Sequence, residues 1–174
     1  MDKKARNVPI HVDVGASMKT VWVGVDPGKY GAVAFLFHDR QHNYVVDMPR
    51  TVDDTDYDIP AMYDVLLAEL VSPFPVKVAL EQVSRPAKLT RCAGIIEGLL
   101  TAIECESAKG ASHIKVLPRD WMDGLGMPTP HTKAHSLALA RELYPEMAEM
   151  LGRKMDDGRA EAILLAHWLR EETR

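Results

Sequence analysis

Two short apolar runs, each ending in a carboxylate, constrain the fold of this chain most strongly. The first is residues 21–26 (VWVGVD) and the second is residues 76–81 (VKVALE). A near-continuous apolar run of this length predicts a strand that is covered on both faces of a sheet. A carboxylate is costly to bury without a partner. We therefore expect Asp26 and Glu81 to end core strands and to share a partner of opposite charge.

A second pair of acids opens the apolar C-terminal segment. Asp157 and Glu161 are four residues apart, so both project from one face of the expected helix. Gly158 clears space between them, and Ala160 and Ala162 let the helix lie close to the sheet. Acids in a first helical turn also complement the helix dipole, so the argument for a site depends on all four carboxylates together.

Four carboxylates without a cluster of Cys or His favour Mg²⁺ or Mn²⁺ over zinc. Phosphodiester hydrolysis needs an activated water and a stabilised leaving oxygen, and two metal ions about 3.5–4 Å apart supply both. Asp26, Glu81, Asp157 and Glu161 are the expected catalytic metal ligands. Asp26 alone also fits a turn before Pro-Gly. Asp156 is an alternative to Asp157, but five helical residues turn through roughly 500° and carry it off the face of Glu161.

The remaining pattern predicts an α/β fold. Strands are expected at 20–26, 32–37, 43–48, 76–83 and 113–117, and helices at 59–71, 87–108, from 118, at 132–144 and at 157–170. Three neighbouring strands followed by strand–helix alternation predict a mixed five-stranded sheet flanked by helices. Residues 1–19 show no period and are expected to form a flexible leader, and 20–174 to form a single domain.

The charge distribution weakens an apparent argument against nucleic-acid binding. The 174 residues carry a formal net charge of −4. Residues 47–69 hold seven acids and one base, a net −6, so the remainder is +2. A local basic face can bind phosphates on a mildly acidic protein, although exposed Lys and Arg are usually only solvated. The candidate DNA contacts are Arg85, Lys88, Arg91, Arg119 and Arg159.

Cysteine and histidine spacing favours structural roles. Cys92 and Cys105 form no CxxC pair, which favours a reducing compartment and core or interface positions. His131 and His135 have a spacing that suits a metal, but the neighbouring prolines favour a loop and a helix start.

Tryptophans and hydropathy add two further expectations. Trp121 and Trp168 are interpreted as core residues rather than base-stacking platforms. No stretch approaches the roughly 20 apolar residues of a membrane span, and the N-terminus lacks the apolar core of a secretion signal. We expect no membrane partner and a cytoplasmic location, in a bacterial or phage-infected cell.

Five segments, in order, resemble the RuvC family of Holliday-junction resolvases, which has the RNase H-like fold, and its phage-type members most. They are 24–28 (GVDPG), 79–83 (ALEQV), 116–121 (VLPRDW), 132–134 (TKA) and 157–166 (DGRAEAILLA). They span roughly residues 20–170. The resemblance implies a homodimeric, Mg²⁺-dependent endonuclease that cuts four-way DNA junctions by paired nicks on strands of like polarity.

The resemblance also implies roles for single residues. It places the metals on the four carboxylates and Lys133 near the scissile phosphate, although Lys133 also fits an ordinary helix start. It implies that helix 87–108 forms the dimer interface, where Gly94 and Gly98 permit close approach. Core packing within one protomer explains the apolar face of that helix equally well.

The chain departs from the family at three positions. The family usually ends with two aspartates, often three apart, and here the second acid is Glu161, which puts the metal preference in doubt. Ser84 stands where some members carry an aromatic residue that stacks on a junction base. Met122 stands where bacterial members have a second lysine.

Three other functions stay open from the sequence. An RNase H-like nuclease can act on a flap, a fork or an RNA–DNA hybrid, and 2′-hydroxyl contacts are not visible in the sequence. A non-catalytic junction-binding module on the same fold is the second. The Gly-x-Asp-x-Gly strand end also opens the actin/hexokinase-type ATPases, but these need two such domains and a second phosphate loop, and this chain is too short for them.

Overall fold

A five-stranded mixed sheet with the order β3-β2-β1-β4-β5 forms the centre of the fold. The strands are β1 (Val21–Asp26), β2 (Ala32–Leu36), β3 (Tyr44–Asp47), β4 (Val76–Glu81) and β5 (Ala111–Val116). β1, β2 and β3 are antiparallel neighbours, whereas β1, β4 and β5 are parallel. This computed structural model describes residues 20–40, 42–70, 74–107, 110–153 and 155–173, and its topology confirms the predicted RNase H-like α/β fold.

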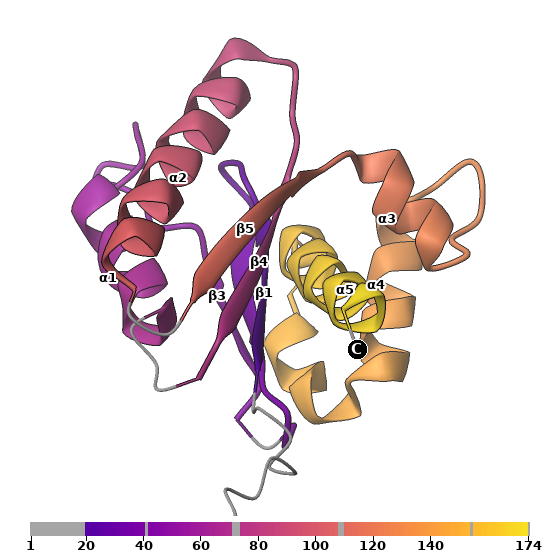
Figure 1. Cartoon of the computed structure of the whole chain (residues 1–174). Helices are drawn as coiled ribbons and strands as arrows, with labels where there is room; N and C mark the ends of the chain where they lie inside the picture. Colours follow the sequence, from indigo (N-terminus) through magenta and orange to yellow (C-terminus); the bar gives the residue numbers. More distant parts are fainter. Residues whose placement is uncertain (1–19, 41, 71–73, 108–109, 154, 174) are drawn as a thin grey trace, which may run out of the picture.

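Helices cover both faces of the sheet (Figure 1). α1 (Ile59–Leu70) and α2 (Ala87–Glu106) pack on one face. α5 (Asp157–Glu172) packs on the other, together with α3 (Pro118–Gly124), α4 (Lys133–Leu143) and the 3₁₀ helix η1 (Pro145–Leu151). The predicted leader, residues 1–19, lies outside the described residues. No helix in the described part of the chain has the length and apolar character needed to cross a bilayer.

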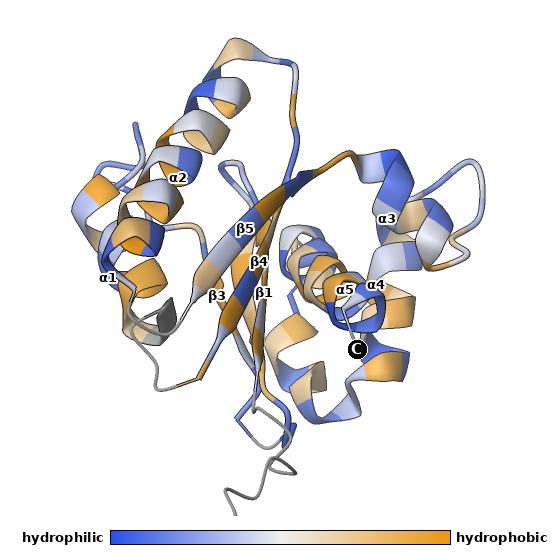
Figure 2. Cartoon of the chain, viewed as in Figure 1, coloured by the Kyte–Doolittle hydropathy of each residue, from blue (hydrophilic) through white to orange (hydrophobic). Residues whose placement is uncertain are grey.

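Each strand contributes to two separate cores because alternate side chains point to opposite faces. In β1, Val23 and Val25 belong to the core under α1 and α2, and Trp22 belongs to the core under α5. In β4, Leu80 faces α1 and α2 whereas Ala79 faces α5. Figure 2 shows the apolar residues concentrated in the strands and on the helix surfaces that meet them. The pattern explains why residues 21–25 and 76–80 are apolar at nearly every position.

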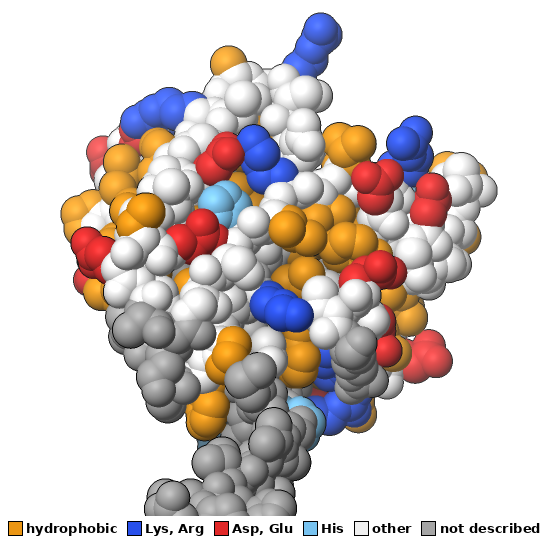
Figure 3. All heavy atoms as spheres, in the orientation of Figure 1, with side chains coloured by type: hydrophobic (Ala, Val, Ile, Leu, Met, Phe, Trp, Pro, Cys, Tyr) orange, Lys and Arg blue, Asp and Glu red, His pale blue; other side chains and the backbone are white. Residues whose placement is uncertain are grey.

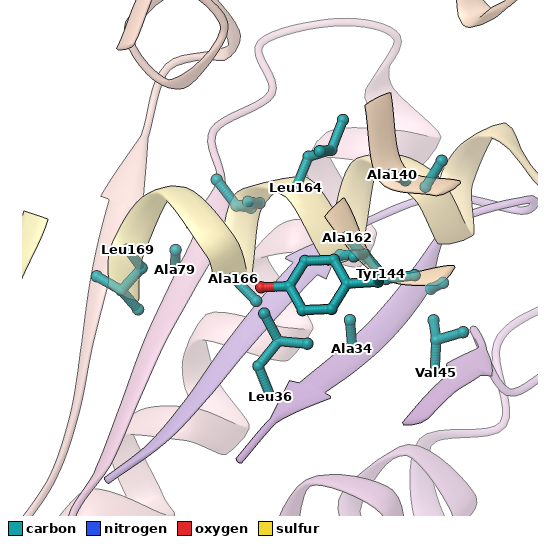
Figure 4. Close-up of a cluster of buried hydrophobic side chains, with 14 of the residues drawn as sticks. Ala34, Leu36, Val45, Ala79, Ala140, Tyr144, Ala162, Leu164, Ala166 and Leu169 are labelled. Atoms are coloured by element: carbon teal, nitrogen blue, oxygen red, sulfur yellow. The ribbon is translucent and has the colours of Figure 1, made fainter. Parts of the chain in front are cut away.

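α5 lies unusually close to the sheet. A Cβ added to Gly24 of β1 would lie 2.0 Å from the Ala162 carbonyl oxygen and 2.6 Å from the Ala166 backbone nitrogen. No side chain fits there, so glycine on the strand and alanines on the helix set the distance between the two elements. In the view of Figure 4, the labelled side chains of Ala162 and Ala166 on the helix and of Ala34 and Leu36 on the strand surround the ring of Tyr144 in one buried cluster. The prediction that small residues let this helix approach the sheet is confirmed.

Several boundaries differ from the predicted ones by a few residues. β4 ends at Glu81 rather than at residue 83, and β5 begins at Ala111 rather than at residue 113. The 3₁₀ helix η1 was not predicted. Cys92 is buried as expected, but Cys105 is exposed on α2. Trp121 is fully buried, which confirms its interpretation as a core residue.

The N-terminus of α4 has a capping box. The Thr132 side chain accepts a bond from the backbone of His135, and the His135 ring accepts one from the backbone N–H of Thr132 at 3.2 Å. Such reciprocal bonds satisfy two amide groups that the first helical turn leaves open. The expected role of His135 at a helix start is confirmed.

Candidate active site

The sheet brings Asp26 and Glu81 to one edge and one face. β1 and β4 are parallel, and Val25 is opposite Leu80 in the register. Asp26 and Glu81 therefore follow at equivalent positions, at the carboxyl ends of adjacent strands. Strand alternation places both on the α5 face, two residues beyond Gly24 and Ala79. The parallel pairing of β1 with β4 and its register are therefore enough to bring Asp26 and Glu81 close together.

The start of α5 brings the other two acids to the same place. A Cβ added to Gly158 would lie 2.0 Å from the Tyr30 carbonyl oxygen and 3.0 Å from the Asp26 Oδ2 atom. The first turn of α5 thus touches the β1–β2 turn and the Asp26 carboxylate, and the expected role of Gly158 in clearing space is confirmed. Asp157 and Glu161 flank this contact on successive turns of the helix.

The charges of neighbouring carboxylates act on two of the four acids, Asp26 and Glu161. Burial raises the pKa of Asp26 well above its ordinary value, and the charges of Glu81, Glu161 and Asp157 raise it further, against the opposing effect of Lys133. Burial, followed by the charges of Glu81 and Asp157, raises the pKa of Glu161 to about 7. Like charges disfavour the ionised forms, so the cluster has more negative charge than its surroundings balance.

Each of the other three acids has a partner of its own. The Lys133 ammonium donates to Asp157 Oδ2. The Trp121 indole N–H donates to Glu81 Oε1 at 3.0 Å and lowers the pKa of Glu81, although burial raises that pKa more strongly. The Ser136 hydroxyl donates to Glu161 Oε1 at 3.3 Å.

His131 lies beside the cluster. Its Nε2 is 3.8 Å from Glu161 Oε1 and 2.9 Å from the Ser136 hydroxyl. Burial, and then the neighbouring His135, lower the pKa of His131. Its Nδ1 is buried and has no hydrogen-bond partner among the described residues. The sequence offered no signal for this contact, since only the spacing to His135 was visible.

The donor chemistry fits a hard divalent cation, but the side chains are not yet arranged around one. Within the described ranges, no three His, Cys, Asp or Glu side chains are placed so that they could hold a metal ion together. Three of the four carboxylates bond neighbouring side chains instead: Asp157 bonds Lys133, Glu81 bonds Trp121 and Glu161 bonds Ser136. Four carboxylates with one lysine among them suit Mg²⁺ or Mn²⁺. To hold one ion together, the carboxylate side chains would have to rotate away from Lys133, Trp121 and Ser136.

Asp156 belongs to a different network. It is fully buried, and it accepts bonds from the backbone N–H and the Nε of Arg153, at 2.6 and 2.7 Å. Its backbone carbonyl accepts the first hydrogen bond of α5 from Ala160. Asp156 therefore fixes the start of the helix, and the charge that acts on Asp26 is that of Asp157. This agrees with the helical-geometry argument for Asp157.

The expected DNA-contacting residues are not all free to bind a phosphate. Arg91 pairs with Asp56 at 3.0 Å, and Lys88 donates to the Thr55 carbonyl oxygen at 3.0 Å. Arg159 is 18% exposed and donates to Asp47 at 2.6 Å and to the Met150 carbonyl at 2.9 Å.

The other two candidates stay accessible. Arg85 is exposed in the loop after β4. The Arg119 side chain is 77% exposed and lies 3.6 Å from Asp120. On the face in Figure 3, Lys and Arg are scattered among Asp and Glu rather than gathered in one basic area. The DNA contacts stay predictions.

Comparisons with known proteins give fold-level similarity only. No protein-family model and no curated protein matches the chain. The solved structure "T. thermophilus RuvC in complex with Holliday junction substrate" is 16% identical, with 90% of this chain and 97% of that chain covered and a TM-score of 0.49. "Thermus thermophilus RuvC structure" is also 16% identical, with 90% and 98% covered and a TM-score of 0.48.

Proposed function

We propose that this chain is a Mg²⁺-dependent, structure-specific endodeoxyribonuclease that resolves four-way DNA junctions by paired nicks. The observation that carries the proposal is the electrostatic cluster of Asp26, Glu81, Asp157 and Glu161 at the carboxyl end of the central parallel strands. Active sites are where burial and like-charged neighbours are commonly arranged to shift pKa values in this way. The five RuvC-like segments support the junction as the substrate.

The protein's own residues divide the work at this site. The four carboxylates would hold the metal, and Mn²⁺ has the same ligand preference. A bound pair of such ions supplies an activated water and a stabilised leaving oxygen. Lys133 pairs with Asp157; if a cation took its place on that carboxylate, the lysine would be free to contact a phosphate. Trp121 orients Glu81 through its indole N–H.

Paired nicks require two active sites, and α2 offers a surface for a second copy. Cys92, Ile96 and Leu100 of α2 face the protein's own core. The opposite side includes Gly94 and Gly98, where an added Cβ would meet nothing within 4 Å. Glycines at this spacing leave a flat stripe along the helix. The proposal is therefore a homodimer with α2 at its interface, which sedimentation velocity tests directly.

One substrate comparison tests the proposed reaction. Labelled four-way junction, duplex, flap and RNA–DNA hybrid are incubated with the protein in Mg²⁺, in Mn²⁺ and in EDTA. We expect symmetric nicks in the junction with either metal, little cutting of duplex and none in EDTA. Cutting of the hybrid or the flap, with the junction intact, would assign the site to a different nuclease activity.

Asp26→Asn separates catalysis from binding. The substitution keeps the side-chain volume and removes one negative charge from the cluster, so nicking should be lost while junction binding survives or tightens. Asp123→Asn, on the exposed part of α3, is the control for the loss of a carboxylate elsewhere. Nicking at the wild-type rate by the Asp26 variant would remove this residue from the site.

A further inference from the structure

A polar pocket lies beside the β1–β2 turn, lined in part by residues of that turn. It has a volume of about 290 Å³, and its lining includes Lys29, Tyr30, Arg50, Asp54 and Met155. This volume is close to the lower end of the range of small-ligand pockets, roughly 300–1,000 Å³. It suits one nucleotide unit and is too small for a duplex.

The pocket adjoins the candidate active site through Tyr30. The point where Gly158 would carry a Cβ is 2.0 Å from the Tyr30 carbonyl oxygen and 3.0 Å from Asp26 Oδ2. The Tyr30 carbonyl oxygen and Asp26 Oδ2 are therefore no farther apart than the sum of these two distances. Successive nucleotides of a strand rise by about 3.4 Å. A strand with one phosphate at the cluster would bring a neighbouring nucleotide to the pocket.

Two cations in the pocket share one carboxylate. Lys29 Nζ is 2.5 Å from Asp54 Oδ2, and Arg50 donates from Nε to Asp54 Oδ1 at 3.0 Å and from Nη2 to the Asp54 carbonyl at 2.7 Å. The Asp54 side chain is 55% exposed, whereas that of Arg50 is 12% exposed. The Asp54 carboxylate thus lies where a ligand oxyanion would contact both Lys29 and Arg50, and it is reached from the solvent.

Arg50 keeps one donor unused. Its Nη1 is buried and has no hydrogen-bond partner in the part of the chain that the structure describes. A buried unpaired donor costs about 1–3 kcal/mol, and a phosphate has more acceptor oxygens than a carboxylate. A phosphate that displaced the Asp54 carboxylate would meet the Nε and Nη2 donors of Arg50 that Asp54 now meets.

The pocket rim carries exposed apolar side chains beside these cations. Tyr30 is 56% exposed and Met155 is 50% exposed. Lys29 Nζ lies 5.6 Å from the centre of the Tyr30 ring. An exposed aromatic ring next to cations is the combination that single-stranded DNA-binding proteins use, because the ring stacks on a base while the cations bind the backbone. The other cation of the pocket, Arg153, is already paired with Asp47 at 2.8 Å.

We infer that this pocket binds one unpaired nucleotide of the substrate strand, with its phosphate on Lys29 and Arg50 in place of Asp54 and its base on Tyr30. The inference rests on the proposed nuclease function, because it places this nucleotide beside the phosphate that is cut. It supplies a base-stacking residue to a chain that has Ser84 where related nucleases carry an aromatic one. Asp54 acts as a competitor that DNA must displace.

Binding of a DNA strand in EDTA tests this site without catalysis. Single-stranded DNA and four-way junctions that carry 2-aminopurine report base stacking as a loss of fluorescence. Tyr30→Leu should weaken binding about five- to hundredfold and abolish the quenching, whereas Tyr30→Phe should stay within twofold of wild type. Asp54→Asn should tighten binding severalfold. Lys29→Gln should reduce the slope of log K against log salt on single strands by about 0.7.

Several results would overturn the inference. Equal binding by wild type and Tyr30→Leu would exclude stacking, and unchanged binding by Asp54→Asn would exclude competition by Asp54. Competition by inorganic phosphate, with no quenching by any strand, would reduce the pocket to a simple anion site and also refute it. Nicking of the junction by the wild type in Mg²⁺ is measured in parallel. Nicking without quenching refutes only this pocket, whereas quenching without nicking refutes the nuclease proposal and leaves a nucleotide-binding pocket with no cut phosphate beside it.

Discussion

Removal of the Glu161 charge should stabilise the metal-free protein, which is an unusual outcome for a substitution in the interior. Burial and the neighbouring carboxylates raise the pKa of Glu161 from 4.5 to about 7. A tenfold change in proton affinity corresponds to about 1.4 kcal/mol. The raised pKa therefore means that ionised Glu161 destabilises the folded state by about 3 kcal/mol.

The pH dependence follows from the sign of this shift. Below pH 4.5 Glu161 is protonated in both the folded and the unfolded chain, so its charge has no effect on stability. Between pH 4.5 and about 7 the unfolded chain loses the proton first, and the folded state becomes progressively less stable. Above pH 7 the full penalty is present. Glu161→Gln removes it and keeps an oxygen that accepts the Ser136 hydroxyl bond.

Urea unfolding at pH 8 and pH 4.5, in EDTA, measures the effect. Glu161→Gln should raise the free energy of unfolding by about 1–3 kcal/mol at pH 8 and by little at pH 4.5. Glu172→Gln, on the exposed end of the same helix, should have no such pH dependence. Equal effects at both pH values, or destabilisation at pH 8, would show that Glu161 is not under electrostatic strain from its neighbours. Added Mg²⁺ should stabilise wild type more than the variant.

Three further substitutions test other parts of the structure. Gly158→Ala should lower stability by about 3 kcal/mol or more and abolish nicking, because its Cβ would lie 2.0 Å from the Tyr30 carbonyl; thermal unfolding at the wild-type temperature would contradict the close contact. Gly98→Ala, which meets nothing within 4 Å, should stabilise monomeric α2 by about 0.5–1 kcal/mol, and sedimentation velocity should show a weaker dimer if α2 is the interface. Trp121→Phe removes the donor that lowers the pKa of Glu81, so the rising limb of the nicking pH profile should move to higher pH, and an unmoved limb would exclude an orienting role.

The sequence predicted the backbone arrangement of the candidate site better than its contacts. Apolar runs identified β1 and β4, and parallel pairing then placed Asp26 and Glu81 side by side. Period and spacing likewise identified the start of α5 near Asp157. These features depend on local periodicity and on general rules of topology. The strands, the mixed sheet and the start of the helix were predicted from the sequence, whereas the pairing of β1 with β4 comes from the structure.

Side-chain pairing between distant segments could not be predicted in this way. Arg159 was expected to contact DNA, but the fold brings it to Asp47, 112 residues away. Trp121 was assigned to the core, and its burial is correct, but its bond to Glu81 depends on how α3 sits beside the end of β4. Tertiary geometry decides such contacts, and residue types alone do not fix which acid a given arginine or indole will meet.

The packing around the candidate site shows how the fold tolerates a cluster that opposes its own stability. Glycine at Gly24 and Gly158 lets α5 approach β1 so closely that backbone atoms, and not side chains, set the distance. That approach buries apolar residues along the whole of α5, at roughly 25 cal/mol for each Å² removed from water. The same approach forces the carboxylates of α5 toward those of the strands. A small movement of α5 away from the sheet would therefore weaken the carboxylate repulsion only by also losing the burial of apolar residues. A cation bound to the carboxylates, or a proton on Glu161, weakens the repulsion and keeps the apolar burial.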